Sequence, residues 1–235
     1  MKNKNILYYL NHNYTVFFIL IFFCIFFSIA NTQISNNIDE ALFVSGTILI
    51  PDENSPQLEF FKDSLSLVIY IQAALIKIGL TNYTISNLSL FISTVFFSIG
   101  IYLVCKNLLN IILKKNSNLI SLIFTSLLLL SDTHMPHTDY PNAYFGAFTA
   151  GIYSIALTTL IFGLLIENKT NLVIFFAILL FLCHPVQGLW IGGVLFLLYI
   201  IDGIFIHKTF KAQNLKYIIL SVLVLIFFTI YFLFI

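Results

Sequence analysis

Long apolar runs separated by short polar segments are the feature that most constrains the fold of this chain. Hydrophobic residues make up 60% of its 235 residues, charged residues make up only 9%, and phenylalanine alone occurs 26 times. No water-soluble core of this size could bury so much apolar surface. The sequence therefore predicts an all-α protein, a polytopic bundle of transmembrane helices. We expect a single integral membrane domain over residues 1–235, which could be the N-terminal part of a longer protein.

The charged residues and the cysteines exclude several classes of protein. The net charge is only +1, which gives no electrostatic footprint for nucleic acid, and every one of the 11 basic residues is lysine. Because arginine is absent, lysine, histidine, the backbone or a metal would have to bind any phosphate or carboxylate. Cys24, Cys105 and Cys183 show no paired spacing, so they indicate neither a disulfide framework nor a thiolate metal site.

Lysines near the ends of the apolar runs predict how the chain crosses the membrane. Lys2 and Lys4 place the start of the chain in the cytoplasm, since lysine is enriched on that side of membrane proteins. The first apolar run is longer than the core of a typical signal peptide, so we expect an uncleaved anchor in a bacterial cytoplasmic membrane. Including this first run, we expect about seven spans, some shorter than the roughly 20 residues that a crossing needs. The expected spans are Tyr14–Ala30, Leu88–Val104, Leu119–Leu130, Phe148–Ile166, Leu172–Cys183, Leu189–Ile206 and Tyr217–Ile235.

The segment Ser64–Leu80 decides the orientation of everything after it. It is apolar but interrupted by two serines, a glutamine and a lysine. If it crosses the membrane, Lys106, Lys114 and Lys115 fall outside the cell. If it lies on or near the outer surface as part of the first loop, these lysines fall in the cytoplasm, as the lysine bias predicts. We therefore expect a helical element in the first external loop.

The first external loop, Asn31–Asp63, contains six of the ten acidic residues of the chain. Asp39 and Glu40 form a pair near its start, and Lys62 lies near its end. A carboxylate pair held just outside a bilayer is a candidate for chemistry, because a chain this apolar cannot distribute charge freely. The alternative is a solvated loop that keeps a membrane protein from aggregating.

A second polar loop on the same predicted face, Ser131–Gly146, contains Asp132, His134, His137 and Asp139. Two imidazoles and two carboxylates within eight positions suit a divalent metal with nitrogen and oxygen ligands. The same residues could equally be solvated or hydrogen-bonded loop residues. A further alternative is that protonated histidines bind a phosphate in place of the missing arginine.

A third polar cluster begins at His184, which a proline follows. Proline ends or breaks a helix and leaves backbone carbonyls without a donor at membrane depth. Membrane proteins tolerate such a break where it lines a water-filled cavity or is buried in protein. His184 and Gln187 are therefore candidate substrate contacts. The alternative is a simple external turn with Trp190 as an interfacial anchor. The small pair Gly188 and Gly192 predicts close helix packing rather than function.

The layout resembles the GT-C superfamily of membrane glycosyltransferases. The resemblance rests on a cytoplasmic N-terminus, one span, and an external loop that opens with the acidic pair in Asn37-Ile38-Asp39-Glu40-Ala41-Leu42. It implies a core of about seven spans, a sugar on a polyprenyl phosphate as donor, and a catalytic or metal-associated role for Asp39 and Glu40. The partners would then be the lipid-linked sugar donor and membrane lipids.

If the resemblance holds, Asp39 acts as a general base on an acceptor hydroxyl, or helps to hold Mg²⁺ or Mn²⁺. A transporter or flippase, or a non-catalytic membrane subunit, remains the alternative. The candidate metal ligands are Asp39, Asp132 and His134, and the candidate substrate-binding residues are Lys62, His134, His137, Asp139, His184 and Gln187.

Overall fold

The computed structural model describes residues 19–22, 24, 38–48, 66–113, 117–131 and 150–201. All regular secondary structure within these ranges is helical, which confirms the predicted all-α class. The last predicted span and most of the first lie outside the described residues. The described helices are α3 (Asp39–Ser45), α5 (Leu67–Lys77), α6 (Asn82–Leu113), α7 (Ser117–Ser131), α8 (Ala150–Ile166), α9 (Thr170–Cys183) and α10 (Pro185–Ile201).

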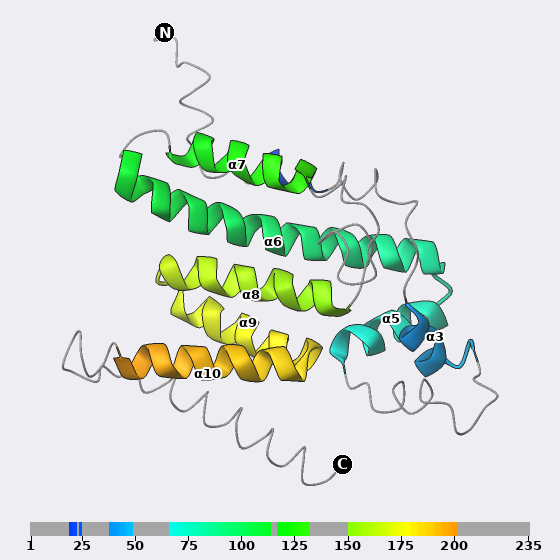
Figure 1. Ribbon diagram of the computed structural model, residues 1–235. Coiled ribbons are helices and arrows are strands. Elements are labelled where there is room, and N and C mark those ends of the chain that lie inside the picture. Colours follow the sequence, from blue (N-terminus) through cyan, green and yellow to red (C-terminus); the bar gives the residue numbers. More distant parts are fainter. Residues whose placement is uncertain are drawn as a thin grey trace.

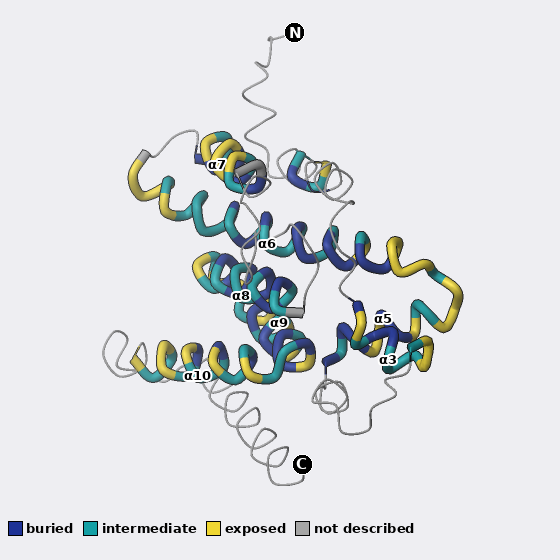
Figure 2. The backbone as a smooth tube through the Cα atoms, turned by 45° about the vertical axis from the view of Figure 1, so that its right-hand side comes forward, coloured by how far each residue is buried: buried dark blue, intermediate teal, exposed yellow. Residues whose placement is uncertain are grey.

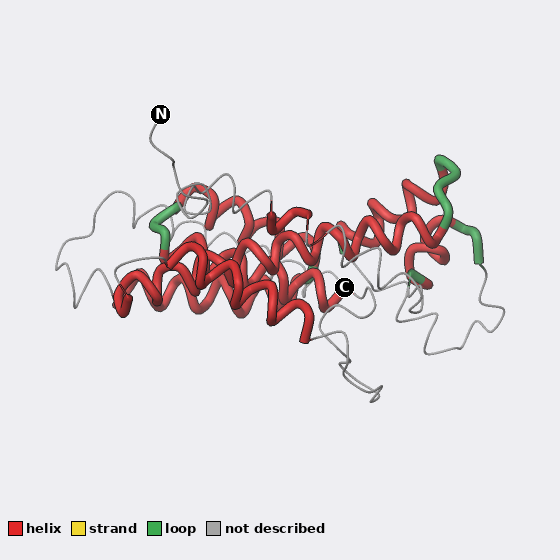
Figure 3. Tube along the Cα trace, turned by 90° about the horizontal axis from the view of Figure 1, so that it is seen from above, coloured by secondary structure: helices red, strands yellow, loops and turns green. Residues whose placement is uncertain are grey.

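Helices α6 to α10 form a bundle in which neighbours along the chain run in opposite directions. Helix α6 lies between α7 and α8, α9 packs against α8, and α10 packs against α9 (Figure 1). Helices α3 and α5 pack against each other at the end of the bundle where α6 begins and α9 passes into α10 (Figures 1 and 3). We call this the α5 end of the bundle. The turn between α8 and α9 lies at the opposite end.

Helix lengths separate α6 from the other helices. At 1.5 Å per residue, the 32 residues of α6 extend about 48 Å, more than the roughly 30 Å of a hydrocarbon core. It is the one described helix that is long and apolar enough to cross a membrane. Helices α7 to α10 are also apolar but have 14 to 17 residues. Helix α5, with 11 residues, extends only about 16 Å, which is well short of a crossing.

Small hydroxyl side chains fill much of the interior of the bundle along α6. Ser93, Thr94 and Ser98 are completely buried, and each donates a hydrogen bond of 2.6 to 2.8 Å to the backbone carbonyl four residues earlier. Exposed residues occur along the helices of the bundle (Figure 2), and they include many large apolar side chains. The interior also holds large apolar side chains, among them Leu157, Ile161 and Leu180. The apolar outer surface suits lipid surroundings, because lipid tails are as apolar as these side chains. The most exposed include Ile111, Ile112, Trp190, Leu127, Phe175 and Leu197.

Glycines allow α6 and α8 to approach each other closely. A Cβ atom added at Gly100 would lie 2.5 Å from the backbone carbonyl carbon of Thr159, and one added at Gly163 would lie 2.8 Å from the Gly100 carbonyl oxygen. The two backbones therefore touch at this crossing. A Cβ at Gly188 would lie 2.4 Å from the Cα of Phe181, which confirms the predicted packing role of Gly188 between α9 and α10.

The turn between α5 and α6 is set by local backbone hydrogen bonds. Gly79, at φ 93°, adopts the left-handed conformation that glycine accepts without strain. Its N–H donates to the Ile76 carbonyl at 2.9 Å, and the Leu80 N–H donates to the Leu75 carbonyl at 3.1 Å. This pair of bonds is a Schellman motif, which satisfies carbonyls that the helix end would leave unpaired. The motif ends α5 before it can lengthen into a span.

The α6–α8 crossing yields a stability prediction. Gly100→Ala should destabilise the protein by about 1–3 kcal/mol, because the new methyl group meets backbone that cannot rotate away. Thermal unfolding of the purified protein in detergent would measure the change. Gly193→Ala is the matched control, since nothing lies within 4 Å of a Cβ at that position. Equal unfolding temperatures for the two variants would contradict the close crossing.

Candidate functional site

The acidic pair of the first loop lies on the outward face of α3. Ile38, Ala41 and Leu42 are buried, and their spacing gives α3 one apolar face. Asp39 is exposed and Glu40 is half-buried, both in the first turn of the helix. Negative side chains in a first turn also stabilise a helix through its dipole. The pair therefore has a structural role available in addition to a chemical one.

Helix α5 joins the acidic helix to the bundle. The buried face of α3 packs in the same apolar cluster as Val68, Ile69 and Ala73 of α5. We call α3, α5 and the described turns after them, residues 38–48 and 66–80, the first-loop unit. On its other side, Gln72 Nε2 of α5 donates a buried hydrogen bond of 2.9 Å to Ser89 Oγ of α6. The unit is thus packed onto the bundle at the α5 end.

His184 caps the start of α10. It lies between the end of α9 and the first residue of α10, which is Pro185. Proline is favoured at this first helical position because its missing N–H would have no helical partner there. The Gln187 N–H donates to Nδ1 of the His184 ring at 3.3 Å, so the ring acts as an N-cap acceptor. The predicted helix break at this proline is therefore a capped corner between two antiparallel helices.

The cap restricts the chemistry that His184 can perform. Nδ1 must present its lone pair to accept the Gln187 N–H, so a neutral ring carries its proton on Nε2. The ring can then offer an N–H donor through Nε2 while the cap is kept. A donor of this kind suits an oxygen of a phosphate or a sugar.

The predicted site residues fall into two groups. Asp39, Glu40, His184 and Gln187 all lie at the α5 end of the bundle, and α5 connects the acidic helix to the α9–α10 corner (Figure 1). Within the described ranges, no three His, Cys, Asp or Glu side chains come close enough to hold a metal ion. A metal role for Asp39 would therefore need ligands from other parts of the chain. Lys62, Asp132, His134, His137 and Asp139 lie outside the described residues.

A polar cluster that the sequence did not reveal lies at the opposite end, between α6 and the α8–α9 turn. Lys106 Nζ and Asn107 Nδ2 both donate to Glu167 Oε1, at 3.0 and 2.9 Å. Burial alone would raise the pKa of Glu167, but these hydrogen bonds and the nearby lysine charges outweigh burial and lower it. The cluster fastens the α8–α9 turn to α6. The sixty-residue separation of these partners left no local signal in the sequence.

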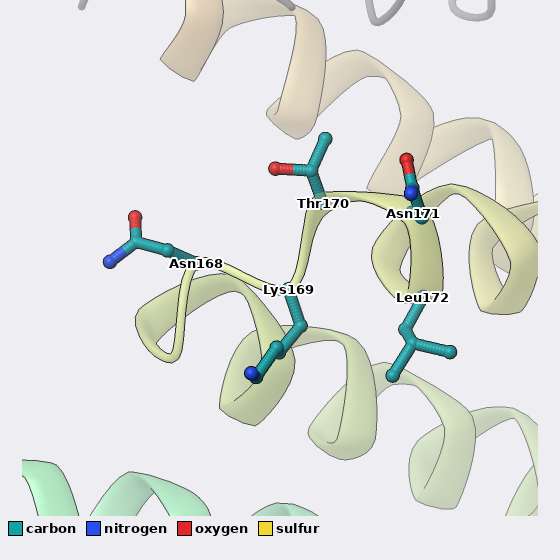
Figure 4. Close-up of a pocket in the computed structure, with 5 residues that line it drawn as sticks. All are labelled: Asn168, Lys169, Thr170, Asn171 and Leu172. Carbon is teal, nitrogen blue, oxygen red and sulfur yellow. The ribbon is translucent and has the colours of Figure 1, made fainter.

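A surface hollow of about 330 Å³ lies beside the same turn, lined by residues 168–172. Its side chains point in different directions and do not converge on a common centre (Figure 4). The Lys169 side chain and the Thr170 hydroxyl lie on different sides of the backbone (Figure 4). The hollow is at the end of the bundle away from Asp39, so it does not belong to the predicted site.

Comparison of this chain with protein-family models, with curated proteins and with solved structures finds no match. The fold by itself defines a class: an all-helical protein whose described part contains one helix long and apolar enough to cross a membrane.

The cap at His184 predicts a difference between two substitutions. His184→Ala should lower stability by about 1 kcal/mol relative to His184→Asn, because asparagine supplies a good N-cap acceptor and alanine supplies none. Thermal unfolding of both variants would measure this difference. Gln187→Ala is the control, since it keeps the backbone N–H that the cap accepts. Equal stability of the alanine and asparagine variants would rule out the cap.

The lowered pKa of Glu167 predicts a pH-dependent contribution to stability. The charged carboxylate stabilises the folded state above its ordinary pKa of 4.5, and this contribution is lost as the pH falls through the lower pKa of the folded state. Glu167→Gln should therefore cost about 1 kcal/mol at neutral pH. The gap between the two proteins should narrow as the pH falls below 4.5. Unfolding temperatures across a pH series would test this, and a pH-independent gap would contradict it.

Proposed function

We propose that this protein is a polytopic membrane glycosyltransferase that transfers a sugar from a polyprenyl-phosphate donor to an acceptor at the outer face of the cytoplasmic membrane. The observation that carries the proposal is the location of the acidic helix α3, which is packed through α5 onto the same end of the bundle as the His184 corner. Carboxylates and a histidine donor at one end of a helical bundle suit a reaction at a membrane surface.

The expected topology can be compared with the ends of the bundle at which the described lysines lie. Helices α6 to α10 serve as spans in this proposal, together with spans outside the described residues. Of the three lysines in the described residues, Lys106 and Lys169 lie at the end away from the acidic pair, as an orientation with lysine in the cytoplasm requires, and Lys77 lies at the α5 end. The short α5 is then the helical element of the first external loop. Helices of 14 to 17 residues would cross where the bilayer is locally thin, or would use flanking residues.

In the proposed reaction, the Asp39 carboxylate accepts the proton of the acceptor hydroxyl as that oxygen attacks C1 of the sugar. The bond from C1 to the donor phosphate oxygen breaks, and the polyprenyl phosphate leaves with its electron pair. The transition state resembles an oxocarbenium ion. Glu40, beside Asp39, is the second acid of the site. The proposal allows a divalent cation such as Mg²⁺ or Mn²⁺, but no step of this reaction depends on it.

Without arginine, the departing phosphate needs other donors. The Nε2–H of His184 is one, because the cap keeps Nδ1 occupied as an acceptor. Gln187, in the first turn of α10, offers a side-chain amide close to it in sequence. Lys62, His134, His137 and Asp139 complete the proposed set from outside the described residues.

A transporter or flippase is less favoured. Coupling sites of such proteins commonly carry ionisable residues in the middle of the spans. In the described part of the bundle, the buried polar side chains are serines, threonines and one glutamine. The Lys106–Glu167 pair lies at one end rather than in the middle.

Asp39→Asn tests the proposed enzyme directly. Membranes containing the protein would be incubated with a set of polyprenyl phosphates that carry different labelled hexoses, and release of the free polyprenyl phosphate would be followed. We expect one donor to be consumed, and the substitution to lower this rate at least about 100-fold, because the base is lost. Asp52→Asn, in the same loop, is the control. An unchanged rate in the Asp39 variant at equal protein level would exclude the proposed base.

A topology measurement would separate the membrane arrangement from the chemistry. Single cysteines at Thr47 and Asn171, on a background without the native cysteines, would be exposed in intact cells to a maleimide that does not cross membranes. Both positions are exposed and lie at opposite ends of the bundle. Labelling of Thr47 alone would agree with the proposal. Equal labelling of both positions would rule out the proposed topology, independently of the result of the transfer assay.

A further inference from the structure

The corner between α9 and α10 leaves backbone carbonyls at the end of α9 without the donor that a continuous helix would supply, and the Cys183 carbonyl is one of them. In a continuous helix, the Cys183 carbonyl would accept the N–H of Gln187, four residues on. At this corner the Gln187 N–H instead donates to the His184 ring. The helical bond that follows is kept, since the Gly188 N–H donates to the His184 carbonyl at 2.9 Å. Because Cys183 is buried, its backbone carbonyl needs a hydrogen-bond donor from another part of the chain.

That donor is Ser66, the residue before α5. Its hydroxyl donates a buried hydrogen bond of 2.6 Å to the Cys183 carbonyl, across 117 residues of sequence. Ser66 occupies the N-cap position of α5, where serine usually binds the N–H groups of its own helix. Here its side chain makes no such bond. The hydroxyl is used for the contact between helices rather than for the local cap.

This hydrogen bond connects the two polar clusters of the proposed site. On one side, Ser66 directly precedes α5, and α5 packs against α3, the helix that contains Asp39. On the other side, Cys183 directly precedes His184, whose ring orientation depends on the corner. A buried hydroxyl–carbonyl bond is costly to leave unmade, so it fixes the relative placement of the two segments.

We propose that Ser66 is a positioning residue, which sets the distance and orientation between the acidic helix α3 and the His184 corner. This inference rests on the proposed function for its meaning, because only a shared site requires that distance to be constant. The placement itself is a physical property that can be measured without any substrate. Ser66 is not proposed to contact the sugar or the phosphate.

Distances between spin labels would test this role. Labels at Thr47 and at Val186, both exposed, report on the first-loop unit and on the first turn of α10. The native cysteines would be replaced by alanine, which keeps the Cys183 backbone carbonyl. We expect one narrow distance distribution for the protein with Ser66. Ser66→Ala should at least double the width of this distribution. Both proteins would be measured in nanodiscs by pulsed electron paramagnetic resonance.

Two further comparisons keep the result specific. Ser66→Thr and Ser66→Val have nearly the same shape, so a narrow distribution for threonine and a broad one for valine would assign the effect to the hydroxyl. Ser93→Ala removes a fully buried hydroxyl that bonds to a carbonyl of its own helix, and it should leave the distribution narrow. An unchanged width in both Ser66→Ala and Ser66→Val, or equal broadening in Ser93→Ala, would overturn the positioning role.

The transfer assay adds a readout that a general loss of folded protein would not give. Ser66→Ala should lower kcat about tenfold with little change in the KM for the consumed donor, because misplaced groups bind substrate but react slowly. Ser66→Thr should restore kcat. If no donor is consumed by the unaltered protein, the proposed function fails while the distance result still decides the role of Ser66. A tenfold rise in KM at constant kcat would instead mark Ser66 as a binding residue and reject positioning.

Discussion

The backbone groups at helix ends must find partners within the chain, and much of this structure depends on how they do so. In an apolar protein, each unpaired N–H or carbonyl removed from water costs free energy that local packing cannot return. Gly79 and Asn168 meet this need through left-handed turns that close α5 and α8. At the His184 corner, the His184 ring accepts the Gln187 N–H and the Ser66 hydroxyl donates to the Cys183 carbonyl. These solutions determine where each helix stops and which neighbours it contacts.

Helix α6 shows how the same constraint operates along the length of a helix. Its hydroxyl side chains bond to carbonyls of their own helix, so they can be buried without a partner from another helix. Small side chains on this face then allow backbone contact with α8 at Gly100 and Gly163. Contact of this kind relies on van der Waals packing rather than on burying large apolar groups. Many aromatic and aliphatic side chains lie on the outer surface, while others, such as Leu157 and Ile161, pack in the apolar core.

The sequence predicted those features that depend on local chemistry. Apolar runs indicate the helical class, and the proline after His184 marks the corner. The lysine bias favours Ser64–Leu80 as a helical element of the first loop, and this segment contains an 11-residue helix. The predicted span Leu88–Val104 is shorter than α6, because polar residues at the start of the helix, and Lys106 and Asn107 near its end, interrupt the apolar pattern. The bond from Ser66 to Cys183 had no sequence signal, since it joins residues 117 positions apart. The loop clusters at Asp132–Asp139 stay predictions.

Asp39 and Glu40 show why the location of the acidic helix, rather than the presence of two acids alone, is the basis of the proposed site. Both acids stand in the first turn of α3, where a helix dipole alone would favour them. What the dipole does not explain is that this short helix is attached, through α5, to the corner at which the His184 ring caps α10. A seven-residue helix needs outside support to keep any fixed position, and α5 supplies that support through apolar packing on one side and buried hydrogen bonds on the other. A solvated loop that only prevents aggregation would not require such attachment, and this difference favours a shared site at the α5 end.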